Sequence, residues 1–99
     1  MKINIKVTNA ALTPASYEII NEKVGSLAKY FDNIISADVE IGINSLHHNK
    51  GNIYKAVVNL LVPKKILRAS AETHDITKSM NEVKNKLKVE LIKYKETHQ

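Results

Sequence analysis

The segment YKAVVNLLVPKKILRASAE, residues 54–72, has apolar residues at every second position on both sides of Pro63-Lys64-Lys65. A period of two is typical of a β-strand, and a proline followed by polar residues is typical of a turn. The segment therefore predicts strands 54–62 and 66–72, joined by that turn. The side chains expected to face the core are Ala56, Val58, Leu60, Val62, Leu67, Ala69 and Ala71, whereas Arg68 is expected to point outward.

The residues after this pair of strands predict a long helix. Asp75 is a suitable N-cap, and apolar residues then recur every three or four positions as far as about Lys95. The expected apolar stripe consists of Ile76, Met80, Val83, Leu87, Leu91 and Tyr94.

Another helix is predicted earlier in the chain, with Thr13 as its N-cap and Pro14 in its first turn. Gly25 lies inside this helix and should weaken it by up to ~1 kcal/mol relative to alanine. A close contact at Gly25 would account for that residue. The apolar stripe of the helix is formed by Tyr17, Ile20, Val24, Leu27 and Phe31.

Two more strands complete the expected architecture. Residues 2–7 and 37–43 alternate in the same way as the first pair of strands, and residues 44–52 are polar and are expected to form a loop. The order is therefore β-α-β-β-β-α. We expect an α+β fold in which two helices cover one face of a mostly antiparallel, four-stranded sheet, as a single domain of residues 1–99.

Composition narrows the possible functions. The chain of 99 residues has no cysteine, which excludes disulfides, thiol nucleophiles and cysteine-ligated zinc and fits a cytoplasmic protein. No apolar run approaches the ~18 residues that span a bilayer, so no membrane partner is expected. Fifteen Lys and Arg against ten Asp and Glu give a net charge of +5. Such a charge suggests binding to a polyanion if the basic residues are clustered.

The lysines of the last helix follow a pattern. At about 100° per residue, Lys84, Lys88 and Lys95 fall on one flank of the apolar stripe, and Lys86 and Lys93 fall on the other. The simplest explanation is that they only keep the helix soluble. However, the acids between residues 76 and 96 are too few to pair with all of them, and this favours a bound polyanion. Further lysines that belong to this prediction are Lys23 and Lys29 in the first helix and Lys78 on the outer face of the last one.

No motif indicates catalysis or metal binding. His47 and His48 are adjacent in a predicted loop, and His74 and His98 lie far from them in the sequence. Metal-binding histidines are usually spaced so that they converge on one ion. We expect no catalytic residue, metal, cofactor or small-molecule substrate, and hence not an enzyme. A protein-interaction domain is a further alternative, because the apolar side chains of Val89 and Ile92 are predicted to lie on the outer side of the helix.

Three segments resemble a known family: LTPASYEIINEKVGSLAKYFD (12–32), RASAETHD (68–75) and NKLKVELIKYK (85–95). They are similar to the short form of the ribosome hibernation-promoting factors, also called ribosome-associated inhibitors or sigma-54 modulation proteins. The resemblance implies a fold related in shape to double-stranded-RNA-binding domains. It also implies binding to the small ribosomal subunit in the mRNA/tRNA channel at the A and P sites, with inhibition of translation in stationary phase or stress.

The resemblance implies that basic residues of both helices face ribosomal RNA. Three positions depart from the family pattern, namely Ser26 and Val89, where a basic residue is common, and Thr77, where a tyrosine is usual. Lys78, Lys84 and Lys88 would compensate. The candidate RNA-binding residues are Lys23, Lys29, Arg68, Lys78, Lys84, Lys86, Lys88, Lys93 and Lys95.

Long-form members of the family carry an additional C-terminal domain that pairs ribosomes, and we expect none in residues 1–99. The protein is expected to be a monomer when free and to need a second factor if ribosome dimers form. The alternative is a general double-stranded-RNA-binding module without ribosome specificity. Such a module would have a basic cluster at the start of its last helix, where only Lys78 lies.

Overall fold

A computed structural model describes residues 1–9, 11–44 and 51–97 of the chain. The helices and strands follow the predicted order, with an additional 3₁₀ segment, η1, after the first helix. The elements are β1 (Lys2–Thr8), α1 (Pro14–Gly25), η1 (Ser26–Lys29), β2 (Ser36–Asn44), β3 (Ile53–Val62), β4 (Lys65–Thr73) and α2 (Ile76–Thr97).

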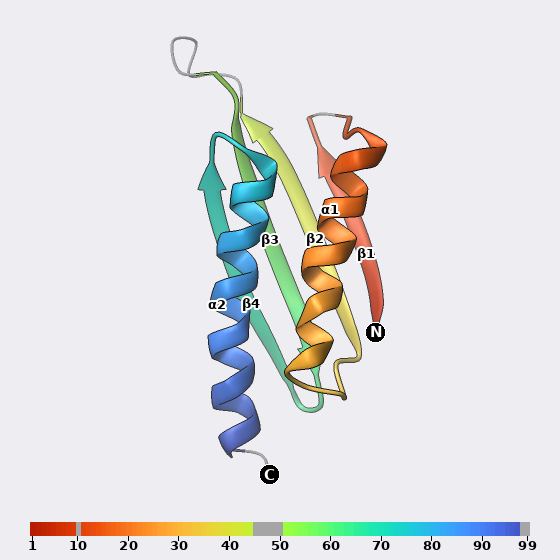
Figure 1. The fold of residues 1–99 in the computed structure, drawn as a ribbon, viewed down its shortest axis with the longest axis vertical. Helices are drawn as coiled ribbons and strands as arrows, with labels where there is room; N and C mark the ends of the chain where they lie inside the picture. The colour runs from red at the N-terminus through yellow and green to blue at the C-terminus, as the bar shows by residue number, and fades with distance from the viewer. Residues whose placement is uncertain (10, 45–50, 98–99) are drawn as a thin grey trace.

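The four strands form one sheet in the order β1-β2-β3-β4. β1 pairs with β2 in parallel, and the two other pairs are antiparallel, so the sheet is mixed and mostly antiparallel, as predicted. Both helices lie on the same face of the sheet, with α1 on the side of β1 and β2 and α2 on the side of β3 and β4 (Figure 1). Within the described residues, the opposite face of the sheet carries no helix, and β4 is one of the two edges of the sheet.

The turn between β3 and β4 is shorter than expected. Val62 pairs with Lys65, so only Pro63 and Lys64 lie in the turn and Lys65 begins β4. Lys64 has a φ of 66°. Proline at the first central position followed by a positive φ at the second is the pattern of a type II turn. The turn therefore places a lysine where glycine is usual.

The core lies between the sheet and the two helices. The residues predicted to face it from β3, β4 and α2 are all buried, including Leu60, Leu67 and Leu87. Tyr94 closes the core near the end of α2, where its ring meets the Phe31 ring edge to face at 5.3 Å between centroids. Its hydroxyl group donates a hydrogen bond of 2.6 Å to the carbonyl oxygen of Pro63. The fold prediction is thus confirmed at the level of packing.

The first helix differs from its prediction in three respects. The α-helical part ends at Gly25, and residues 26–29 continue as the 3₁₀ segment. Tyr17, expected in the apolar stripe, is 38% exposed. No atom outside the helix lies within 4 Å of where a Cβ on Gly25 would be, so close packing does not account for this glycine. The predicted cap is confirmed, because Thr13 Oγ1 accepts a hydrogen bond of 3.2 Å from the backbone N–H of Ser16.

The start of α2 is fixed by a small polar network. Asp75 caps the helix as predicted, since its carbonyl oxygen accepts a hydrogen bond of 2.9 Å from the backbone N–H of Ser79. The side chain of Ser79 is completely buried. Its hydroxyl donates to the carbonyl oxygen of Tyr54 at 2.8 Å and lies 2.7 Å from the Thr73 hydroxyl. The network ties α2 to the first residues of β3 and the last residue of β4.

Candidate nucleic-acid interface

One row of lysines on α2 faces the first helix and its 3₁₀ extension. We call Lys84, Lys88 and Lys95 the inter-helix row. The Lys88 ammonium group lies over the ring of Tyr30, 5.1 Å from its centroid, and Tyr30 is the C-cap residue that follows η1. Lys95, two turns further along α2, lines a cleft together with Tyr30. The second half of α2 therefore lies beside the end of η1 along this row.

The other row, Lys86 and Lys93, follows the opposite flank of α2 and is called the edge row. Lys86 Nζ donates a hydrogen bond of 2.7 Å to the carbonyl oxygen of Ser70 in the edge strand β4. Lys93 is exposed and lies seven residues further along, on the same side of the helix. The predicted separation of the α2 lysines into two flanks is therefore present in the structure.

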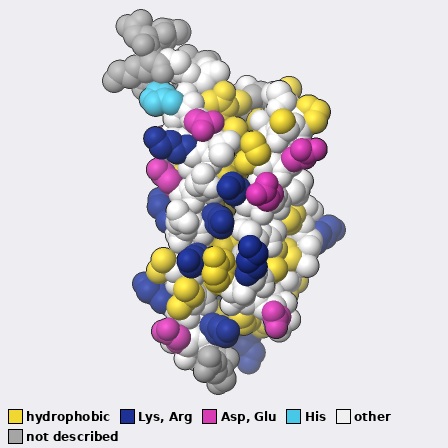
Figure 2. Space-filling model, in the orientation of Figure 1, with side chains coloured by type: hydrophobic (Ala, Val, Ile, Leu, Met, Phe, Trp, Pro, Cys, Tyr) yellow, Lys and Arg dark blue, Asp and Glu magenta, His cyan; other side chains and the backbone are white. Residues whose placement is uncertain are grey.

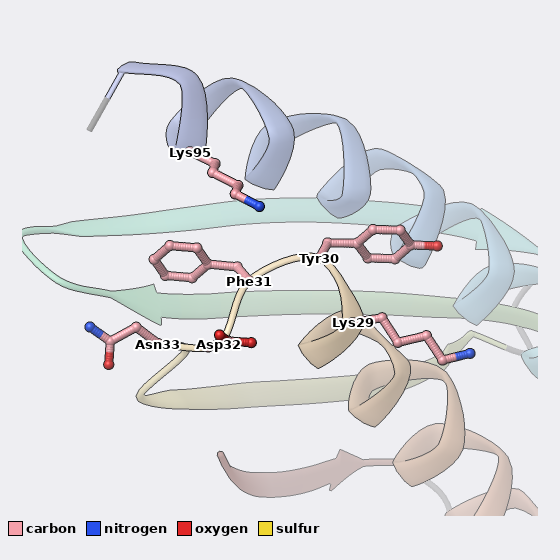
Figure 3. Close-up of a pocket in the computed structure, with 6 residues that line it drawn as sticks. All are labelled: Lys29, Tyr30, Phe31, Asp32, Asn33 and Lys95. Atoms are coloured by element: carbon pink, nitrogen blue, oxygen red, sulfur yellow. The ribbon is translucent and has the colours of Figure 1, made fainter. Parts of the chain in front are cut away.

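The cleft between η1 and the last turns of α2 joins lysines from both helices (Figure 3). It has a volume of about 190 Å³. The side chain of Lys95 extends from α2 toward residues 30–31, whereas the side chain of Lys29 extends below the Tyr30 ring and away from Lys95 (Figure 3). Asp32 also lines the cleft, so the lining has one carboxylate as well as its two lysines. The lining residues are Lys29, Tyr30, Phe31, Asp32, Asn33 and Lys95.

The candidate lysines are not neutralised within the protein. Across residues 1–9, 11–44 and 51–97, the one ion pair within 4.0 Å joins Lys55 to Glu72, and neither is a candidate residue. Basic side chains gather over the middle of the helical face, and acidic ones lie mostly nearer its margins (Figure 2). The face therefore has a positive charge that an external anion can balance.

Three other candidate residues take different positions. Lys23 is half-buried in the last turn of α1, and Lys78 is exposed in the first turn of α2. Arg68 lies on the open face of the sheet, where it lines a hollow with Lys55 and Glu40. The structure therefore separates Arg68 from the lysines of the helices. This separation was predictable from the sequence. Arg68 was expected to point away from the core, and a strand residue that does so also points away from the helices that cover the core.

Some features of the surface escaped prediction. Nothing in the sequence identified Tyr30 as the ring beneath Lys88 or the Ser70 carbonyl as the acceptor for Lys86, because both contacts join elements distant in the chain. His47, His48 and His98 lie outside the described residues. Within the described part of the chain, no group of three His, Asp or Glu side chains is placed to hold a metal ion. In that same part, no helix has the length and apolar composition needed to cross a bilayer.

Three comparisons relate the chain to known proteins. The chain is 27% identical over 95 residues to the ribosome hibernation promotion factor of Bacillus subtilis (strain 168), which covers 96% of this chain and 49% of that protein. A ribosomal subunit interface protein from Coxiella burnetii has a similar structure, with a TM-score of 0.83, 25% identity, and 96% and 98% of the two chains covered. The Protein Y N-terminal domain of Thermus thermophilus shares the fold, with a TM-score of 0.81, 18% identity, and 95% and 99% covered.

The chain spans about half the length of its curated Bacillus relative. The family model described as "Sigma 54 modulation protein / S30EA ribosomal protein" matches residues 3–99, which is nearly the whole sequence. The chain belongs to the Sigma 54 modulation protein / S30EA ribosomal protein family.

Proposed function

We propose that this protein is a ribosome hibernation factor that binds the small ribosomal subunit in the mRNA/tRNA channel, at the A and P sites. It inhibits translation there in stationary phase or stress. The observation that carries the proposal is the set of unneutralised lysines on the helical face, contributed by α1, η1 and α2. The family match over residues 3–99 supports a ribosomal partner for that face.

The proposed action is steric and needs no chemical step. A folded domain that occupies the channel excludes mRNA and tRNA from the same space. The lysines supply affinity, since each contact between an ammonium group and a phosphate releases a condensed counterion from the RNA. Held in place by a hydrophobic core, the lysines lose little conformational freedom of the backbone when they bind.

The charge distribution on α2 distinguishes this function from general binding to double-stranded RNA. A general module would concentrate its positive charge at the start of the last helix. In α2, Lys78 is the one lysine in the first two turns, and both lysine rows begin later, at Lys84 and Lys86. The middle and end of the helix are therefore the parts expected to bind.

Co-sedimentation with purified small subunits tests the proposal. The double variant Lys86→Glu/Lys93→Glu reverses the edge row and should abolish binding while the fold is retained, as judged by circular dichroism. The matched control, Lys2→Glu/Lys6→Glu, makes the same change of charge on exposed residues of β1 that point to the open face of the sheet. It should still bind.

Unchanged co-sedimentation of the edge-row variant would show that the wrong face was chosen. Equal loss in both double variants would show that only the net charge matters. A competition between generic duplex RNA and small subunits completes the test. Ribosome specificity requires that the duplex compete poorly.

A further inference from the structure

Two apolar side chains lie within the lysine surface, on the side of α2 that faces solvent. Val89 is 51% exposed and Ile92 is 41% exposed. At about 100° per residue, both lie more than 130° around the helix from Leu87, which is completely buried. They are three residues apart and are therefore neighbours on the helix surface. Neither side chain is part of the hydrophobic core.

Each of these apolar residues has a lysine one turn before it and one turn after it. Lys86 and Lys93 are three positions before and four positions after Val89. We call the two apolar residues and the four lysines around them the framed patch. It consists of Val89, Ile92, Lys86, Lys88, Lys93 and Lys95, where Lys88 and Lys95 are four positions before and three positions after Ile92.

Across the width of α2, the framed patch has one lysine row on each side and the two apolar side chains between them. The edge row lies on the side of Val89 and the inter-helix row on the side of Ile92, and a helix with its side chains is about 10–12 Å wide. Lys86 already donates to the Ser70 carbonyl, and Lys88 lies over Tyr30. An ammonium group has three N–H donors, so both lysines keep donors for an external acceptor.

Acidic residues limit the length of the patch. Glu82 and Glu96 are both exposed and lie seven residues before and after Val89. Each is about 10.5 Å from Val89 along the axis, at 1.5 Å per residue. Glu90 is half-buried and lies toward the sheet edge. An anionic partner therefore meets the helix along about 20 Å, which is less than the whole length of α2.

The chemistry of the patch favours RNA over protein. Two half-exposed aliphatic side chains present far less than the few hundred Å² of apolar surface that mark a protein-binding site. The core of a protein interface is also depleted in lysine, whereas four lysines surround this patch. A single RNA strand would be expected to stack its bases on aromatic rings, and the framed patch contains none.

A double-stranded RNA surface matches the patch. The major groove of RNA is too deep and narrow for side chains to reach, whereas the minor groove is wide and shallow, with sugars between two phosphate backbones. We infer that the solvent side of α2 lies along the minor groove of a ribosomal RNA helix, with Val89 and Ile92 against the sugars and the two lysine rows on opposite backbones. The inference rests on the proposed function and names the form of RNA that the surface contacts.

The first test measures affinity for purified small subunits. Val89→Ala/Ile92→Ala removes apolar contacts without changing charge, and should weaken binding about fivefold to tenfold if both side chains are covered. The matched control, Ile35→Ala/Ile66→Ala, truncates two exposed side chains away from the patch, 52% and 61% exposed, and should bind like the wild type.

The second test locates the RNA. The chain has no cysteine, so Asn85→Cys, which is exposed on the solvent side of α2, carries a single iron chelate that cleaves nearby sugars by hydroxyl radicals. If the chelate lies in a minor groove, it should cut both strands of one RNA helix, at sites offset toward the 3′ ends of the strands. The same chelate on Ile66→Cys should not cut that helix.

Wild-type affinity for the alanine double variant, or cuts confined to unpaired RNA, would overturn the inference while the proposed function stands. Failure of the wild-type protein to bind small subunits would overturn both.

Discussion

The ammonium group of Lys86 donates a 2.7 Å hydrogen bond to the backbone carbonyl of Ser70, and so joins one flank of α2 to the free edge of β4. A sheet edge exposes unpaired backbone groups that can recruit another strand, and a lysine placed there discourages such pairing. Lys86 therefore contributes to the edge of the sheet as well as to the charged face. Lys93, on the same flank, accepts a hydrogen bond from the Thr97 hydroxyl through its backbone carbonyl, but its ammonium group has no hydrogen bond or ion pair within the described residues.

Lys86 and Lys93 should consequently respond differently to neutralisation. Replacing Lys86 with methionine should lower the free energy of unfolding by at most about 0.5 kcal/mol, because the lost hydrogen bond is exposed to water. Lys93→Met should leave it unchanged, although both variants should bind small subunits less tightly. Urea denaturation of both variants measures the difference. Greater destabilisation by Lys93→Met would contradict the assignment.

Binding to small subunits should depend steeply on salt. With about 4–6 phosphate contacts, a plot of log affinity against log salt should have a slope of roughly −3 to −5. Neutralising Lys95 should reduce the steepness by about one unit. Arg68→Gln should leave the slope unchanged, since Arg68 lies on the opposite face of the sheet. Titrations from low to physiological salt give all three slopes, and a flatter slope for Arg68→Gln would place the RNA on the open face.

The buried hydroxyl of Ser79 should matter for stability. Ser79→Ala leaves the carbonyl oxygen of Tyr54 without its 2.8 Å hydrogen bond, and alanine is the better helix former. The net loss in the free energy of unfolding should be about 1–2 kcal/mol. Asn85→Ala, at an exposed position of the same helix, is the control and should be neutral or slightly stabilising. A neutral Ser79→Ala would mean that the network at the start of α2 contributes nothing.

The turn after β3 should tolerate glycine better than its own lysine. Lys64 has a φ of 66°, a region that glycine enters without the steric cost that a Cβ incurs. Lys64→Gly should stabilise the protein by about 0.5 kcal/mol, whereas Lys64→Val should destabilise it, because β-branched residues are poorly accommodated at positive φ. Thermal unfolding of the two variants should shift in opposite directions. A shift in the same direction would show that the backbone conformation at residue 64 is not the controlling factor.

The sequence predicted the architecture because its patterns are local and strong. Alternation in residues 54–72 and the three-four spacing after Asp75 each depend on neighbouring residues only, and both recur in the structure with the expected side chains buried. The 3₁₀ segment after Gly25 was not predicted, because periods of 3.0 and 3.6 residues differ little over four residues. Tyr17 fits the apolar spacing and yet is exposed, so spacing alone does not show how far the core extends.

The candidate site was predictable in part for the same reason. Helical spacing alone separates Lys86 from Lys88, and the structure places them on opposite flanks of α2. The groups that each lysine contacts depend on which strand forms the sheet edge and on where the first helix ends. Those are properties of the topology, which no local pattern specifies.

The position of β1 has a consequence for exchange of its amide hydrogens. Among the described strands, β1 is an edge strand that pairs with β2 alone, and the paired residues are 34 apart in sequence, as for Asn4 and Asp38. An edge strand has a neighbour on one side only, whereas β3 is paired on both sides, so we expect the backbone amides of β1 to exchange with solvent deuterium faster than those of β3. β1, α1 and η1 follow one another in the chain and form one unit, which includes Lys23 in α1 and Lys29 in η1. RNA bound to lysines of both helices would hold this unit closed, so docking should slow deuterium uptake in a strand that the RNA never touches.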